Sequence, residues 1–288
     1  MISKNKAFSL IELSIVILVI GVLIAGAIQG SVLVKKFKVK TAQTLTTSSD
    51  VNGIKNLAMW LETSLDNSVT INSSSTVTKW NDINPQSVSK VNAYNTSATL
   101  PVYVENVING LPVVRFSGTS KNILVDPSGN GMQFIAGTNY TIFVVEQRVV
   151  SGNISGNNGM FLTGGGSGVS KNLQYGYLND AFISNDWGYD WTIPVTLSAA
   201  ITPRIHTLKF DTSIGKYYSM KSNVSTPYSV TNTAFIGHPL SSYVGASIGG
   251  FGSRDLSLAE MIVFTRALTT VEINSVEAYL GKKYAIKI

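Results

Sequence analysis

The chain has 288 residues, of which 44% are apolar and 13% charged, and it contains no cysteine. This composition is typical of a globular protein, and the lack of cysteine excludes disulfides, cysteine-ligated zinc and thiol catalysis. Residues 1–40 contain six lysines and one glutamate, so they carry +5 of the formal net charge of +6. Because a nucleic-acid-binding body needs a basic face, the sequence does not predict nucleic acid as a partner.

The N-terminal region is an apolar segment with one charge. Between Phe8 and Val34 the only charged residue is Glu12, and residues Ile15–Ile28 are all apolar or glycine. As a helix, residues 8–34 would extend about 40 Å, enough to span a bilayer. A carboxylate inside such a segment is costly and marks a functional position, although a glutamate that merely reaches the headgroups is the alternative. Ala25–Ala27 could also imitate an ordinary secretory cleavage site.

The residues Lys6-Ala7-Phe8-Ser9-Leu10-Ile11-Glu12-Leu13 resemble the class III signal of type IV prepilins and pseudopilins. The resemblance implies that residues 1–7 are a leader, which a prepilin peptidase removes between Ala7 and Phe8, and that Phe8 is then N-methylated. It also implies that Glu12 of one subunit pairs with the Phe8 amine of a neighbour. Two features depart from the family: Ala7 stands where glycine is usual, and Gln29-Gly30 stands where many major pilins have proline.

The resemblance further implies a cellular route. The precursor would cross the inner membrane once with its body outside, and would then enter a surface pilus or a periplasmic pseudopilus. Its partners would be other pilin subunits, the prepilin peptidase, an inner-membrane assembly platform and a cytoplasmic ATPase. Lysine placement opposes this topology, since two lysines precede the span and four follow it at positions 35, 36, 38 and 40, and the positive-inside rule would leave the more basic side in the cytoplasm.

Beyond the span, residues 41–56 are expected to complete the N-terminal helix, and from residue 57 the pattern changes to period two with Gly-, Asn- and Ser-rich turns such as Asn109-Gly110. Many short strands with frequent turns predict a β-sandwich over residues 57–288. The expected strands are 57–61, 76–80, 101–104, 113–117, 140–150, 160–163, 173–178, 206–210, 216–220, 246–249 and 259–265.

The C-terminal segment has a helical pattern. Thr269 and Glu272 fit a capping box, and apolar residues then recur at helical spacing to Tyr284. A helix over residues 270–283, lying against the sandwich, is therefore predicted. The fold class is α+β, with a long N-terminal helix, an all-β body and a short C-terminal helix.

The body resembles a concanavalin A-like (laminin-G-like) jelly-roll. The resemblance lies in the order of several motifs, each of which matches a strand of that fold. These motifs are Trp60-Leu61-Glu62, Lys79-Trp80-Asn81-Asp82, residues 109–116, residues 140–145, Gly249-Gly250 and residues 258–268. The fold serves lectins, adhesion modules, glucanases and spacers, so it implies no single function.

Catalysis is not predicted. No strand carries the alternating carboxylates that retaining glucanases of this fold use. His206 and His238 are the only histidines; His206 lies in an expected strand and His238 in a loop, and no Ser/His/Asp grouping or metal pair follows from their spacing.

One stretch of the body, residues 175–191, combines aromatic residues with Asn and Asp and could form a binding site. Sugars stack on flat rings and hydrogen-bond to Asn and Asp, and calcium takes carboxylate oxygens. The same residues could equally cover the sandwich edge and form turns. The candidate ligand residues are Asp180, Asp186, Trp187, Tyr189, Asp190 and Trp191.

The sequence therefore predicts a structural pilin subunit that requires no cofactor, with calcium as an option at the aromatic stretch. Two alternatives remain open: a minor or tip pilin that binds a glycan or another surface, and a pseudopilin of a type II secretion system.

Overall fold

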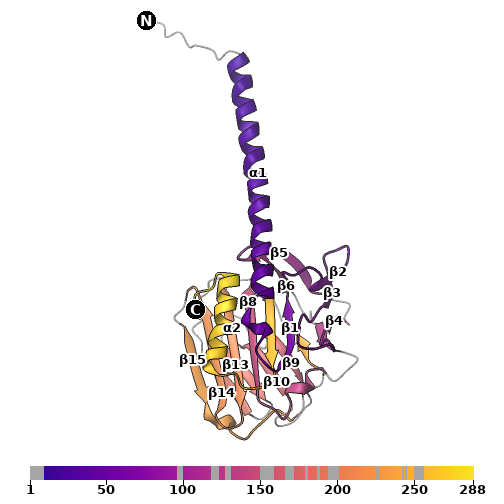
Figure 1. Ribbon diagram of the computed structural model, residues 1–288, viewed down its shortest axis with the longest axis vertical. Coiled ribbons are helices and arrows are strands. Elements are labelled where there is room, and N and C mark those ends of the chain that lie inside the picture. Colours follow the sequence, from indigo (N-terminus) through magenta and orange to yellow (C-terminus); the bar gives the residue numbers. More distant parts are fainter. Residues whose placement is uncertain are drawn as a thin grey trace.

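The computed structural model has a long helix that projects from a β-sandwich body (Figure 1). It describes residues 10–95, 100–117, 123–126, 131–149, 159–165, 172–178, 181–186, 189–193, 201–224, 227–241, 243, 245–249 and 256–288. The projecting helix, α1, spans Leu10–Thr47, and α2, which spans Thr270–Tyr284, lies on the body beside the entry of α1 (Figure 1). The expected fold class is confirmed.

Helix α1 ends at Thr47, so the expected continuation to residue 56 is wrong. The hydroxyls of Thr46, Thr47 and Ser48 each donate to a backbone carbonyl one turn earlier. The Asn52 amide donates to the carbonyls of Thr46 and Thr47. These side chains satisfy the last carbonyls of the helix and offer the backbone an alternative to further helix, and the chain turns through the 3-10 helix Asp50–Asn52.

The body consists of two antiparallel sheets among the described residues. The first sheet runs, from edge to edge, β15 (Tyr228–Asn232), β14 (Gly215–Ser222), β13 (Pro203–Asp211), β8 (Tyr140–Arg148), β17 (Leu256–Phe264), β6 (Leu111–Phe116) and β5 (Val102–Ile108), and β1 (Leu57–Glu62) also pairs with β17. The second runs β12 (Tyr189–Ile193), β11 (Ala181–Asp186), β10 (Asn172–Leu178), β9 (Gly159–Gly165), β16 (Ser247–Ile248), β7 (Ile123–Val125), β4 (Ala93–Tyr94), β3 (Val77–Trp80) and β2 (Val69–Ile71).

All the strands expected from the sequence are present, with shifted ends, and six more were not predicted: β2, β4, β7, β11, β12 and β15. The turn between β5 and β6 follows the sequence closely. Asn109 and Gly110 both have positive φ, 53° and 80°, between the paired residues Ile108 and Leu111. An Asn-Gly pair is favoured where both central residues of a hairpin turn need positive φ.

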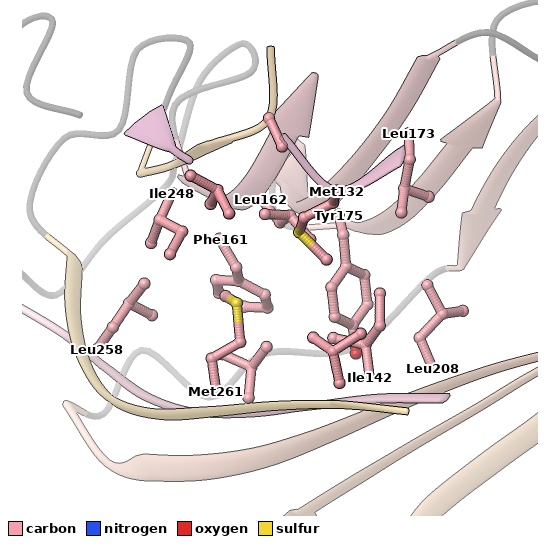
Figure 2. Packing of buried hydrophobic residues seen from close by; sticks show 14 of the residues in the cluster. Met132, Ile142, Phe161, Leu162, Leu173, Tyr175, Leu208, Ile248, Leu258 and Met261 are labelled. Carbon is pink, nitrogen blue, oxygen red and sulfur yellow. The ribbon is translucent and has the colours of Figure 1, made fainter. Parts of the chain in front are cut away.

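Two hydrophobic cores lie on the two faces of the first sheet. The larger fills the space between the sheets, where Phe161 and Tyr175 of the second sheet meet Ile142 and Met261 of the first (Figure 2). The second lies between the first sheet and the layer formed by α2 and the end of α1, and includes Ala42, Trp60, Val276 and Leu280. The outer core therefore attaches both helices to the sandwich.

The predicted capping box at the start of α2 is confirmed. The Thr269 hydroxyl accepts from the Glu272 amide, and a Glu272 carboxylate oxygen accepts from the Thr269 amide at 2.9 Å. Glu272 also forms an ion pair with Arg266. Hydrogen bonds from Arg266 and then Thr269 outweigh partial burial and lower the pKa of Glu272 to about 2.

Replacing Glu272 with alanine is expected to lower the free energy of unfolding by about 1 kcal/mol at neutral pH, because a cap and a partly exposed ion pair are lost. Since the folded-state pKa is lowered, the contribution is present above the unfolded pKa and is lost as pH falls from about 4.5 towards 2. Denaturant titrations of the full chain at several pH values measure this, with exposed Glu105→Ala as the control. A cost that persists unchanged at the lowest pH would contradict the assignment.

Candidate functional site

The first functional feature is the exposed apolar surface of α1. Its large apolar side chains from Leu10 to Phe37 are 46–83% exposed, on every side of the helix. Within the described part of the chain, α1 is the one helix long and apolar enough to cross a membrane. Its 38 residues extend about 57 Å at 1.5 Å per residue. Such a surface needs a lipid or protein partner, since a single-chain soluble protein rarely exposes an apolar patch of this size.

Glu12 lies in the first turn of α1 and is exposed, surrounded along the helix by apolar residues. Ala7 and Phe8, the predicted processing residues, lie outside the described residues. Three glycines of the same segment, Gly21, Gly26 and Gly30, have no atom within 4 Å of the place that a Cβ would take. Packing within this chain therefore does not require glycine at these positions.

The second feature is a buried polar cluster where α1 enters the body. We call Thr46, Glu62, Glu260, Tyr279, Lys283 and Tyr284 the junction cluster. The Lys283 ammonium donates to Glu260 at 2.8 Å, to Glu62 at 3.0 Å and to the Thr46 hydroxyl at 2.7 Å. All three ionic side chains are 0% exposed. Lys283 of α2 thus joins the last turn of α1 to strands β1 and β17.

The carboxylates of the junction cluster are fully hydrogen-bonded. Glu62 accepts from the Ser64 hydroxyl and from the amides of Ser64 and Leu65. Glu260 accepts from the Trp60 indole at 2.7 Å and from the hydroxyls of Tyr279 and Tyr284, each at 2.8 Å.

The pKa shifts of Lys283 and Glu62 favour the charged forms of these two side chains. Burial opposes charge on Lys283, but Glu260 and then Glu62 outweigh it and raise the pKa of the lysine. Burial is likewise outweighed at Glu62, where Lys283 and the hydrogen bonds of Ser64 and Leu65 lower the pKa. The hydrogen-bonded ion pairs of Lys283 thus attach the last turn of α1 to the body.

A second buried network links the two sheets. Glu146 of β8 accepts from the Tyr177 hydroxyl of β10 at 2.7 Å and lies 3.1 Å from His206 Nε2 and 3.5 Å from Arg204 Nη1. Burial is the largest effect on His206 and lowers its pKa, and the positive charge of Arg204 lowers it further. Together they outweigh Glu146, which acts to raise the pKa. His206 is therefore a neutral residue of the sandwich interior and lies on a strand, β13, as predicted. His238 lies after the 3-10 helix Thr233–Phe235.

Four of the six candidate ligand residues lie in β11 and β12 of the second sheet, where β12 is the edge strand. Asp186 pairs with Tyr189, and Asn185 with Asp190, along β11 and β12. Asp180 and Trp187 lie outside the described residues. Trp191 is 8% exposed and its ring lies 6.0 Å from that of Phe235. Trp191 is therefore a core residue, and a surface platform that includes it is not supported.

Metal ligands do not gather in the described ranges, where no three His, Cys, Asp or Glu side chains come together as a metal site. Calcium binding that involves Asp180 would include a residue outside those ranges.

The N-terminus gives the decisive comparison. Residues 2–28 match the family model described as the prokaryotic N-terminal methylation motif. This segment is a type IV prepilin-like signal. Residues 10–28 of the prepilin-like signal lie on the exposed apolar half of α1 and include Glu12, so this part of the motif coincides with the exposed helix surface. The motif thus supports a pilin-like or pseudopilin-like subunit. No curated protein matches the chain.

Solved structures show the fold of the body. A Trypanosoma rangeli sialidase in complex with sialic acid matches with a TM-score of 0.53 and 18% identity, over 80% of this chain and 33% of the sialidase. The binding domain of botulinum neurotoxin serotype D matches with a TM-score of 0.52 and 12% identity, over 83% of this chain and 53% of that protein. The binding domain of Paraclostridial Mosquitocidal Protein 1 matches with a TM-score of 0.51 and 13% identity, over 80% of this chain and 52% of that protein. The chain thus spans a third to a half of these proteins, and the likeness shows a β-sandwich.

Proposed function

We propose that this chain is a structural subunit of a type IV pilus or a related filament. The leader, residues 1–7, is removed between Ala7 and Phe8, the apolar half of α1 packs in the filament core, and the sandwich faces outward. The observation that carries the proposal is the coincidence of the methylation motif with a helix whose large apolar side chains are exposed.

Glu12 is proposed to pair with the N-terminal amine of Phe8 on a neighbouring subunit. Leader removal creates this amine, so only processed chains offer the partner charge. In an apolar filament core an unpaired carboxylate is strongly penalised, and the pair would fix the axial register between subunits. Because an unprocessed chain offers no Phe8 amine to Glu12 of its neighbour, it should be incorporated poorly.

The glycines of α1 fit helix packing between subunits. Glycine costs about 1 kcal/mol relative to alanine in a helix interior, and no contact among the described residues explains it at Gly21, Gly26 or Gly30. Gly26 and Gly30 are four residues apart, the spacing at which small residues allow two helices to approach closely. In this proposal the neighbour's α1 occupies that space.

Processing and assembly require partners from the cell. A prepilin peptidase cuts the leader, an inner-membrane platform and a cytoplasmic ATPase drive assembly, and other pilin subunits complete the filament. The precursor resides in the inner membrane with the body outside, and then enters a surface pilus or, as a pseudopilin, a periplasmic pseudopilus.

A second candidate function is that of a minor or tip pilin that adheres through its body. It is favoured by the likeness of the sandwich to two toxin binding domains and to a sialidase that holds sialic acid. Asp180, Asp186, Trp187, Tyr189 and Asp190 remain the proposed ligand residues, with calcium as an option. Glycan-array binding with and without chelator tests this, since binding lost in an Asp186→Ala/Asp190→Ala variant would support the site and absence of any glycan signal would remove it.

The processing site makes its own prediction. Ala7→Trp is expected to abolish leader removal, because the peptidase must accommodate the side chain before the cut, whereas Ala7→Gly should be processed at least as fast as the natural chain. Intact mass from cells that contain a prepilin peptidase measures this. A mature mass for Ala7→Trp equal to that of the natural chain would place the cut elsewhere.

A further inference from the structure

Four exposed lysines surround α1 where the apolar segment ends. We call Lys35, Lys36, Lys38 and Lys40 the lysine collar. Within the described residues no ion pair involves any of them, and the only hydrogen bond that a collar ammonium makes there joins Lys40 to Gln43 at 3.5 Å. At 100° per residue these positions face several sides of the helix, so the collar presents unneutralised positive charge around α1.

The collar lysines line two grooves between α1 and the body. The larger, about 620 Å³, is lined by Lys35, Lys36 and Lys40 and by the carboxylates of Asp66 and Glu105. The smaller, about 260 Å³, is lined by Lys38 and by Lys282 of α2. Gln43 donates to Asp66 at 3.1 Å. Apart from Lys283, which is paired in the junction cluster, five lysines and two carboxylates thus line the two grooves, and the excess positive charge calls for an anionic partner.

The position of the collar along α1 indicates which anionic partner it meets. Glu12 and Lys35 are 23 residues apart, which is about 35 Å along a helix. A bilayer has a hydrocarbon core of about 30 Å. When Lys35 lies at one headgroup layer, Glu12 therefore reaches the opposite one, and only apolar residues, glycine, Ser14, Gln29 and Ser31 lie between them.

We propose that the lysine collar binds the anionic phospholipid headgroups of the outer leaflet while the chain is in the membrane, and so sets the depth of α1. The collar cannot enter the hydrocarbon core without a large cost, and anionic headgroups attract each lysine near the surface. At that depth the Glu12 carboxylate and the preceding Ala7-Phe8 bond lie at the cytoplasmic surface. The inference rests on the proposed anchoring of the chain in the inner membrane with its body outside, and not on its assembly into a filament.

The depth set by the collar has a consequence for Glu12. At the cytoplasmic headgroup layer its carboxylate is hydrated, so anchoring the chain carries no desolvation cost for this charge. Extraction into a filament removes this hydration. The collar thus separates a membrane state in which Glu12 needs no partner from an assembled state in which it does.

A fluorophore near the collar can test this proposal. Because the chain contains no cysteine, Ser31→Cys gives a single labelling site just before the collar. The full chain with a fluorophore at residue 31 is placed in vesicles of phosphatidylethanolamine and phosphatidylglycerol. Quenching by headgroup-labelled phosphatidylglycerol is compared with quenching by headgroup-labelled phosphatidylcholine. The collar variant replaces Lys35, Lys36, Lys38 and Lys40 with Gln, and the control variant replaces Lys55, Lys79, Lys209 and Lys287, which form no ion pair in the described residues, with Gln.

The natural chain and the control variant should be quenched more by phosphatidylglycerol than by phosphatidylcholine. The collar variant should lose this preference by at least about fivefold, the contribution of one lysine near an anionic surface, and its label should lie deeper by up to about one helical turn, 5 Å. Equal quenching of the natural chain by both lipids, or a preference that the collar variant keeps, would overturn the proposal. A collar variant with unchanged lipid contacts but poor filament incorporation would assign the collar to a neighbouring subunit instead.

Discussion

Replacing Glu12 with alanine is expected to leave the chain processed and membrane-bound but to reduce its incorporation into filaments by about 100-fold or more. The reason is that the variant leaves the Phe8 amine of a neighbouring subunit unpaired in an apolar core, and breaking a buried ion pair costs about 3–5 kcal/mol. Immunoblots of the membrane fraction and of sheared fibres give the two amounts separately. Glu12→Gln, which keeps the shape of the side chain but not its charge, should fail in the same way.

The matched control for Glu12 is Ser14→Ala, two residues along the same exposed turn. Ser14 donates only to the carbonyl of Leu10 in its own helix, at 2.8 Å, so its loss removes no charge and should leave incorporation within about twofold of the natural chain. Normal incorporation of Glu12→Ala would refute the charge pair, while processing lost in Glu12→Ala would show that the residue acts earlier, at the peptidase.

Replacing Lys283 with methionine is expected to lower the free energy of unfolding by about 3–5 kcal/mol, because Glu62 and Glu260 then share a buried space without their cation. Lys283 helps to hold the pKa of Glu62 down, so this pKa should rise in the variant, and the destabilisation should shrink as pH falls and Glu62 becomes protonated. Denaturant titrations of the full chain in detergent at neutral and acidic pH measure both effects.

Two further variants isolate the charge at the junction cluster. Lys282→Met alters the exposed neighbour on α2 and should change stability by less than about 0.5 kcal/mol. Adding Glu62→Gln and Glu260→Gln to Lys283→Met should recover part of the loss, since no unpaired charge then remains. A cost below about 1 kcal/mol for Lys283→Met at neutral pH would show that the cluster does not hold α1 to the body.

The N-terminal and C-terminal helices were predictable because their signals are local. Glu12 stands out as one charge among apolar residues, and Thr269 with Glu272 is a capping pair that the structure reproduces. The end of α1 was harder to place. Thr46, Thr47 and Ser48 terminate the helix through side-chain bonds to the backbone, and the sequence pattern alone did not distinguish this from a weak continuation.

The sheet pairing depended on contacts distant in sequence. Strands β2, β4 and β7 have two or three residues each, which is too short for a period-two pattern to be recognised. Trp191 shows the same limit for the site: alternation alone suited a surface platform and a core equally, and only the contact with Phe235 decides for the core.

The junction cluster was not predicted, although two of its residues carried a signal. Lys283 falls on the apolar stripe of α2, seven residues after buried Val276, and Glu260 interrupts the otherwise uncharged strand Leu256–Phe264. A charge at a buried position needs a partner, so each residue indicated a buried ion pair. Glu62 as the third member follows only from the pairing of β1 with β17, which brings Glu62 opposite Glu260.

The central claim is that a processed form of this chain is built into a filament. The most direct test is the intact mass and N-terminal sequence of the protein in sheared surface fibres. The account predicts a chain that begins at N-methylated Phe8. A chain that begins at Met1, or after Ala27, would contradict it and leave an anchored or secreted β-sandwich in place of a pilin.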